Sequence, residues 1–392
     1  MKSRVIFLCN AFDENTRRKR SIETDSPAGS RKVFFMAKAL KEGNVRPYIL
    51  SFGRGKSSSI LRWYKREAKI VNGIPYIYSS FCSLWLISEI ISFFGLLDLL
   101  VRLSLKSNVA IVFYNRRLLY IFHLLLAKAL GYRCILDLED NEFTDKQNRN
   151  LRDIFYLKPI SILFDYFCKQ GAILACKAIK TSTSIKKTIC YYGIVDLNLF
   201  QKKPKKKGIN FLFSGALLED AGGEILLEVI KKMRTHGNLG FRKASFFITG
   251  FGPLGDKFYQ IASSKKDPKV FYYGKLNESD YQKVLKKSDV GLALKKIDGK
   301  FANTTFPSKV IEFSSAGLLT ITTDVSDVRK LLADNALYLK SNNPKELFNL
   351  IKKITLSKKL LSTKAKDCSN RIAKICNLRK EGMRLRGFIF ND

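Results

Sequence analysis

The sequence predicts an α/β protein of two Rossmann-like domains with a ligand-binding cleft between them. Its length of 392 residues exceeds what one ordinary hydrophobic core organises, which favours two domains. Short apolar runs that suit buried strands alternate with amphipathic runs that suit helices, which is typical of β-α units around a parallel sheet. Ligands of such sheets lie beyond the carboxyl ends of the strands, so we expect the site there.

The N-terminal domain is predicted over residues 1–200. Its expected strands are RVIFLCN, RPYILSF, VAIVFYN, RCILDLED and AIKTSTS. The runs SRKVFFMAKALKEG and RLLYIFHLLLAKALG are expected helices, and each closes on a glycine, the residue preferred just past a helix end.

The C-terminal domain is predicted over residues 209–370, after the basic linker QKKPKKKG at 201–208. Its expected strands are INFLFSG, ASFFITG, VFYYG and DVGLALK, and its expected helices are GGEILLEVIKKMRTHG and ESDYQKVLKKS. Residues 371–392 are predicted to form a C-terminal helix that can cross back to the N-terminal domain.

The charge balance points to an anionic partner. Lys and Arg number 70 against 34 Asp and Glu, a formal net charge of +36. Nucleic acid and an anionic lipid surface both fit such a charge. The sequence shows no zinc-finger spacing, RNA-binding aromatic sheet motif or helix-turn-helix, so a nucleic-acid-binding protein is kept as an alternative only.

Cysteine usage indicates free thiols in a reducing cytosol. The eight cysteines form no C-x-x-C pair, and with only two histidines a zinc site is not expected. They are Cys9, Cys82, Cys134, Cys168, Cys176, Cys190, Cys368 and Cys376.

The apolar stretch at 81–103 contains Glu89, Asp98 and Arg102, so we expect a surface or interfacial helix rather than a membrane span. The opening MKSRVIFLCNAF suits a buried strand better than a signal peptide. NTRRKRS at 15–21 is expected to be a basic loop. Next to SLWLISEIISFFGLLDLL and ILRWYKREAKIV it suggests a face for anionic lipid that combines basic and aromatic residues, and simple solubilising charge is the alternative.

The segment NTTFPSKVIEFSSAGLLTITTD predicts a short helix that leads into an apolar strand. Thr304 or Thr305 can cap the helix, Pro307 fits its first turn and Gly317 suits its end.

Two charged residues stand three apart in this helix. Lys309 and Glu312 form either a surface ion pair or a pair that faces a ligand with complementary groups. The amides at the start of the helix attract anions, and Lys309 adds a full positive charge there.

This segment resembles the donor-site signature of retaining GT-B glycosyltransferases of family 4, the glycosyl transferases group 1. Three segments before it resemble the same family in order and spacing: FLFSGALLEDAGGEILLEVIKKM, FFITGFGP and VFYYGKLNESDYQKVLKKSDVGLAL. The resemblance implies GT-B architecture and transfer of a sugar from a nucleotide-sugar donor to a lipid-linked or polysaccharide acceptor. It implies no metal and no cofactor, and a place in cell-envelope polysaccharide biosynthesis. From the resemblance together with the basic and aromatic face described above, we expect peripheral association with the cytoplasmic face of the membrane.

By this resemblance, Glu312 accepts hydrogen bonds from the ribose hydroxyls and Lys309 offsets phosphate charge. The backbone around Thr305 to Ser308 holds the diphosphate or the sugar. The further donor-side candidates are Thr304, Phe306, Gly215, Gly250, Lys275 and Lys295.

The sequence departs from the family pattern twice. Thr304 stands eight positions before Glu312, where the family has a second glutamate. Ala216 and Ala221 or Gly222 stand where the family carries diphosphate-gripping cations, so Lys275 and Lys295 are the nearest substitutes. A catalytically degenerate member is therefore an alternative, and a sugar-nucleotide epimerase would need more cleft acids and bases.

In the N-terminal half, TDSPAGSRKVFFMAKALKEG resembles the family's glycine-containing loop. Gly29 and Ser30 either approach a phosphate or simply begin a helix. RCILDLEDNEF ends in Glu139 and Asp140, the acceptor-side catalytic candidates, and at most one of them should face the site, because adjacent strand residues point to opposite faces. The alternative is a solvated strand end. His123, on a strongly apolar helix, is expected to be a core or interface residue rather than a catalytic one.

Overall fold

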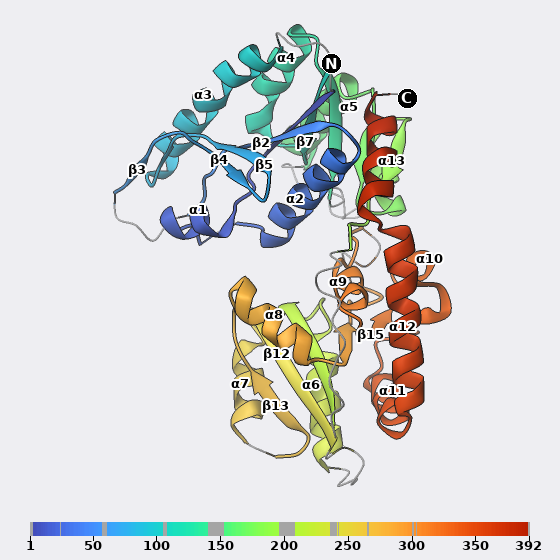
Figure 1. The fold of residues 1–392 in the computed structure, drawn as a ribbon. Helices are drawn as coiled ribbons and strands as arrows, with labels where there is room; N and C mark the ends of the chain where they lie inside the picture. The colour runs from blue at the N-terminus through green and yellow to red at the C-terminus, as the bar shows by residue number, and fades with distance from the viewer. Residues whose placement is uncertain are drawn as a thin grey trace. The chain divides into compact units, whose positions relative to one another are not determined.

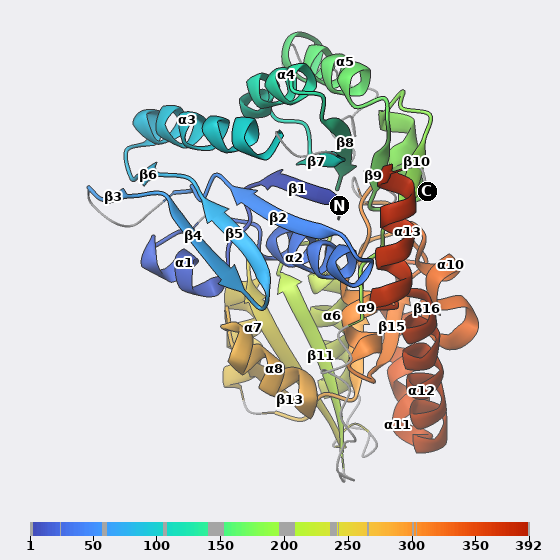
Figure 2. The ribbon, with the colours of Figure 1, turned by 45° about the horizontal axis from the view of Figure 1, so that its top comes forward.

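The computed structural model describes residues 3–23, 25–56, 61–104, 108–139, 153–195, 208–235, 241, 243–264, 266–299, 302 and 304–390. The chain forms two compact units (Figures 1 and 2). The N-terminal unit comprises residues 1–194 and 378–392, and the C-terminal unit comprises residues 195–377. Each unit contains its own largely parallel sheet, so the predicted α/β class with two Rossmann-like units is confirmed.

The sheet of the N-terminal unit has eight strands within the described residues, in the order β10-β9-β8-β7-β1-β2-β5-β4. All neighbours are parallel except β4, which runs antiparallel to β5. The strand order reverses between β1 and β7. The strands are β1 (Arg4–Cys9), β2 (Arg46–Ser51), β4 (Glu67–Val71), β5 (Ile74–Tyr78), β7 (Val109–Tyr114), β8 (Arg133–Leu138), β9 (Ala172–Leu174) and β10 (Thr188–Cys190), with a separate pair β3 (Trp63–Tyr64) and β6 (Phe81–Cys82).

Helices cover both faces of this sheet. α3, α4 and α5 lie on one face, while α2 lies on the other beside α13 (Figure 2). Gly382 lets α13 approach α2, because an added Cβ would lie 2.0 Å from the carbonyl oxygen of Ala39. The helices are α1 (Glu14–Lys19), α2 (Pro27–Glu42), α3 (Trp85–Ser104), η1 (Leu118–Tyr120), α4 (Ile121–Ala129), η2 (Asp153–Leu157), α5 (Lys158–Phe167), η3 (Lys177–Ser182) and α13 (Leu378–Phe390).

The predicted strand AIKTSTS is wrong. These residues belong largely to the 3₁₀ helix η3, and the strand β9 lies just before it. The hydroxyls of Thr181 and Ser182 donate to carbonyl oxygens three residues earlier, at 2.9 and 2.7 Å. Such local bonds let threonine and serine compete with ladder pairing, which favours the turn.

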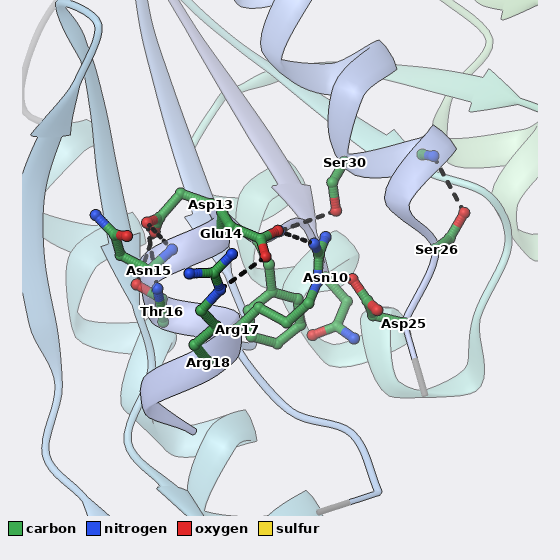
Figure 3. Close-up of polar contacts among 12 residues, drawn as sticks. Asn10, Asp13, Glu14, Asn15, Thr16, Arg17, Arg18, Asp25, Ser26 and Ser30 are labelled. Atoms are coloured by element: carbon green, nitrogen blue, oxygen red, sulfur yellow. Dashed lines mark hydrogen bonds and ion pairs between the residues drawn. The ribbon is translucent and has the colours of Figure 1, made fainter. Parts of the chain in front are cut away.

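The predicted basic loop NTRRKRS is also wrong, because most of it forms α1. The Asp13 carboxylate caps this helix by accepting from the amides of Asn15 and Thr16 (Figure 3). Glu14 binds Arg17 and Arg18 at 2.6 and 3.0 Å. The cations of this segment are therefore largely engaged by neighbouring acids.

The sheet of the C-terminal unit is entirely parallel, in the order β13-β12-β11-β14-β15-β16 over the described part of the chain. The order reverses between β11 and β14, which defines the switch point. The strands are β11 (Ile209–Ala216), β12 (Ala244–Phe251), β13 (Lys269–Tyr272), β14 (Val290–Ala293), β15 (Leu319–Thr323) and β16 (Leu337–Leu339). The helices are α6 (Gly223–Thr235), α7 (Gly255–Ser263), α8 (Glu278–Lys287), α9 (Lys309–Ser315), α10 (Val328–Leu332), η6 (Ala333–Asn335), α11 (Pro344–Leu356) and α12 (Lys358–Ile375).

Three further expectations from the sequence concern the linker, the cysteines and membrane-spanning helices. The expected linker at 201–208 lies outside the described residues except for Gly208. All eight cysteines are free thiols, and all but Cys190 are buried. None of the helices in the described residues combines the length and apolar character needed to cross a bilayer.

Candidate functional site

Glycines bring the strand ends of the C-terminal sheet close together. Gly215 and Gly250 are register partners at the carboxyl ends of β11 and β12, with φ of +128° and +136°. A Cβ added to Gly250 would lie 1.7 Å from the carbonyl oxygen of Gly215. The Gly250 amide donates to the carbonyl oxygen of Gly274 at 2.8 Å. These two predicted positions are thus brought together where a ligand of the sheet is expected.

Lys309 and Glu312 form an ion pair on α9. Lys309 Nζ lies 2.5 Å from Glu312 Oε2, and the side chains are 31% and 11% exposed. The Glu312 carboxylate is therefore mostly removed from solvent, unlike a typical surface pair.

Tyr281 of α8 ties this pair to the switch point. Lys309 Nζ donates to Tyr281 Oη at 3.1 Å and lies 4.7 Å from the centre of its ring. Tyr281 Oη lies 3.2 Å from Ser214 Oγ, near the end of β11. Burial, with the nearby Glu312 charge, raises the pKa of Tyr281 to about 12, so this hydroxyl stays protonated at neutral pH.

Helix α9 begins later than predicted. Its N-cap is Ser308, whereas Thr304 and Thr305 were expected to cap. Thr305 Oγ1 instead accepts from Lys295 Nζ, and the Thr304 hydroxyl is buried without a hydrogen-bond partner in the described part of the chain. The predicted end is confirmed, because Gly317 adopts a φ of +71° just after the helix.

The backbone before α9 is partly engaged. The Ser308 amide donates to the carbonyl oxygen of Phe306 at 2.9 Å, and Pro307 carries no amide hydrogen. Of the backbone donors expected in this segment, the Ser308 amide is therefore already bonded and Pro307 offers none.

Lys275 and Lys295, the cations expected to replace the family's diphosphate-gripping residues, both lie just beyond the carboxyl ends of strands in the C-terminal sheet. Lys295 follows β14, and its carbonyl oxygen accepts from Thr323 Oγ1 at the end of β15, at 2.5 Å. Lys275 follows β13; it is exposed, and its Nζ lies 5.4 Å from the centre of the Phe251 ring. Both lysines therefore add positive charge where the strands end.

In the N-terminal unit, Lys32 of α2 gathers two carboxylates at the end of β8. Its Nζ lies 2.8 Å from Asp137 Oδ1 and 2.6 Å from Glu139 Oε2. Tyr114 Oη donates to Glu139 Oε2 at 3.4 Å. Asp140, the other predicted catalytic residue, lies outside the described residues.

Burial sets the charges of this cluster. It raises the pKa of Asp137 to about 6, although Lys32 opposes this shift. Burial lowers the pKa of Lys32, but Asp137 and Glu139 outweigh it and hold that pKa above the ordinary lysine value. Lys32 is therefore charged at neutral pH and positions the Glu139 carboxylate.

Gly29 and Ser30 have local roles near this cluster. A Cβ on Gly29 would lie 2.6 Å from Tyr114 Oη, so the glycine makes room for the tyrosine. Ser30 Oγ accepts from the Phe12 amide at 3.0 Å (Figure 3). His123 is buried as predicted, and burial lowers its pKa to about 4.

The two units with their largely parallel sheets have the GT-B fold, which similar solved structures share. Solved structures of glycosyltransferases with this fold are similar to the chain. Sucrose-phosphate synthase from Thermosynechococcus elongatus is 12% identical with a TM-score of 0.69, covering 98% of this chain and 97% of that one. HepE from Anabaena in complex with UDP-glucose is 12% identical with a TM-score of 0.67, covering 99% and 100%. WaaG, a glycosyltransferase involved in lipopolysaccharide biosynthesis, is 11% identical with a TM-score of 0.63, covering 99% and 100%.

The sequence comparison places the family signal in the C-terminal unit. Residues 195–374 match the family model described as glycosyl transferases group 1. The matched segment contains the glycine pair, Tyr281 and the Lys309–Glu312 pair. A search of curated proteins gives no match.

Proposed function

We propose that the protein is a glycosyltransferase that moves a sugar from a nucleotide-sugar donor to a lipid-linked or polysaccharide acceptor, with retention at the anomeric carbon. The observation that carries the proposal is the half-buried Lys309–Glu312 pair, anchored through Tyr281 to the switch point inside the matched segment. A nucleotide donor is supported by HepE, whose structures contain UDP and UDP-glucose.

In this proposal the donor is held by groups of opposite character. Glu312 accepts hydrogen bonds from the ribose hydroxyls, while Lys309, Lys295 and Lys275 stabilise the diphosphate as it leaves. The bond from the anomeric carbon to the diphosphate oxygen breaks, a bond to the acceptor oxygen forms, and the acceptor loses its proton. Positive groups that are already in place where negative charge develops stabilise the transition state and so accelerate the reaction.

On the acceptor side, Glu139 and Asp140 remain the proposed catalytic residues. The contact with Lys32 holds the Glu139 carboxylate in place, and Glu139 is the group proposed to take the acceptor proton. The nucleotide sugar is a substrate, and no metal or cofactor enters the proposal. We place the reaction at the inner face of the cell membrane, in cell-envelope polysaccharide assembly.

Nucleotide binding tests the donor site. UDP, GDP and ADP are added separately to the wild type, Glu312→Ala and the control Glu228→Ala, whose exposed glutamate lies on α6 of the same unit. We expect at least one nucleotide to raise the melting temperature of the wild type and the control by mass action, and not that of Glu312→Ala. Absence of any shift in the wild type would refute the donor site.

Two further outcomes separate the alternatives. Nucleotide binding without transfer from radiolabelled nucleotide sugars to membrane extracts would indicate a catalytically degenerate protein. A shift produced by duplex DNA alone, with a steep salt dependence, would favour the nucleic-acid-binding alternative that the net charge of +36 raises.

A further inference from the structure

Helix α3 has apolar side chains on both of its sides. The buried side contains Leu96 and Leu100 together with Ser88 and Ser92. On the outer side, Ile87, Ile90, Phe94 and Val101 recur at helical spacing and are all exposed. The core therefore does not use this second apolar stripe, which is suited to an apolar environment outside the chain.

Helices α4 and α5 continue this surface. Phe122 and Leu125 of α4 and Ile162 and Tyr166 of α5 are exposed, again one helical turn apart in each helix. The ring of Phe93 contacts those of Phe94 and Phe122 at centroid distances of 4.9 and 5.5 Å, which joins the α3 and α4 parts.

The three helices lie side by side over the same face of the sheet (Figures 1 and 2). We define the three-helix apolar face by Ile90, Phe94, Phe122, Leu125, Ile162 and Tyr166. Phe94, Phe122 and Tyr166 are 63%, 64% and 67% exposed, so their rings lie largely in water in the isolated chain. Exposed apolar side chains gathered on neighbouring helices in this number mark an interaction site.

The charges beside this face are positive. Lys158 and Lys169 are exposed at the two ends of α5, and Lys169 Nζ lies 6.0 Å from the centre of the Tyr166 ring. Asp98 is paired with both Arg66 and Arg102. The net charge of +36 opposes association of two copies and attracts an anionic surface.

We propose that the three-helix apolar face docks on an anionic phospholipid bilayer, with its rings at the acyl boundary and the flanking cations at the headgroups. This deepens the membrane partner of the proposed function and does not depend on the donor site. The sequence predicted this face on the basic segment of α1, on residues 60–71 and on the α3 segment. Acids engage Arg17 and Arg18 of α1, so the proposed face keeps α3 and adds α4 and α5.

Vesicle binding by the full chain tests this inference. The wild type is sedimented with vesicles of phosphatidylcholine, and with vesicles in which about one third of the lipid is phosphatidylglycerol. The variant Phe94→Glu/Phe122→Glu changes two exposed rings of the face. The matched control Tyr259→Glu/Leu356→Glu changes two exposed apolar residues of the C-terminal unit and adds the same charge.

We expect the wild type and the control to bind the anionic vesicles, and the face variant to bind at least about tenfold more weakly. Equal binding of the face variant and the control, or no preference of the wild type for anionic vesicles, would overturn the proposal. So would a sedimentation-velocity change from dimer to monomer in the face variant without lipid, because it would assign the face to a second copy. The rise in melting temperature with UDP is measured in parallel on the wild type. If UDP gives no rise while vesicle binding is intact, only the donor site is contradicted.

Discussion

Tyr281 is the residue that turns a local ion pair into part of a site. Its hydroxyl contacts Lys309 and Ser214, so it fixes the lysine relative to the end of β11. Lys309 alone has the freedom of a long side chain, and ordering such a side chain costs conformational entropy on binding. A preset lysine reduces that cost.

Tyr281→Phe is expected to keep the packed ring and to lose the positioning bond. We expect about a fivefold to tenfold weaker affinity for the nucleotide that the wild type binds, corresponding to roughly 1 kcal/mol for one hydrogen bond. Titration calorimetry measures this loss. Tyr259→Phe, an exposed tyrosine on α7, serves as the control and should leave the affinity unchanged. Unchanged affinity in Tyr281→Phe would show that the hydroxyl does not position the lysine.

Asp137 gives the folded state a pH dependence. Its folded pKa is raised to about 6, so between about pH 4 and pH 6 the folded state retains a proton that the unfolded state has lost. This contribution to stability is present below that window and is lost as the pH rises through it.

Asp137→Asn should remove the loss of stability that accompanies the rise in pH. The difference in free energy of unfolding between the wild type and the variant should change by the order of 2 kcal/mol between pH 4 and pH 7, with the wild type becoming relatively weaker at the higher pH. Denaturant titrations at both pH values measure it. A difference that stays constant with pH would show that Asp137 does not hold its proton in the folded state.

At the scale of elements, the backbone conformation of glycine lets the carboxyl ends of β11 and β12 lie close together at the candidate donor site. Gly250 combines a positive φ with a close approach to the Gly215 carbonyl, so alanine would strain the backbone and separate two strand ends. Gly131 also has a positive φ, but an added Cβ there would meet nothing within 4 Å.

Gly250→Ala is therefore expected to cost at least about 3 kcal/mol of unfolding free energy, and Gly131→Ala about 1 kcal/mol from backbone strain alone. Chemical denaturation compares the two. Equal losses would indicate that the close contact between β11 and β12 contributes nothing beyond the strain of the positive φ.

The sequence predicted those elements whose pattern lies within one short segment of the chain. The strands β1, β7 and β11 are runs of consecutive apolar residues, and the glycine after α9 marks the end of that helix. The strand β9 has three residues, too few to give a recognisable pattern. The sequence therefore predicted a strand in the following segment, which forms η3.

The candidate site divides in the same way. Lys309 and Glu312 are three residues apart, so the helical period alone brings them together. Lys32 and Asp137 are 105 residues apart and meet only because the fold brings Lys32 of α2 to the end of β8. A single sequence contains no signal for such a contact, and Tyr281 was missed for the same reason.

For the whole molecule, the excess of positive charge and the three-helix apolar face should respond differently to salt. Attraction between a chain of net charge +36 and an anionic vesicle is screened within a Debye length, about 10 Å at 0.1 M salt and about 3 Å at 1 M. Burial of exposed rings such as Phe94 is not screened, because it depends on apolar area removed from water.

Binding to the anionic vesicles should therefore weaken steeply as salt rises and then level off above zero. Sedimentation over a salt series measures both parts. The face variant Phe94→Glu/Phe122→Glu should lose the residual binding at high salt, whereas the control Tyr259→Glu/Leu356→Glu should retain it. Wild-type binding that falls to nothing at high salt would mean that charge alone brings the protein to the bilayer, and the rings of α3 and α4 would then need another explanation.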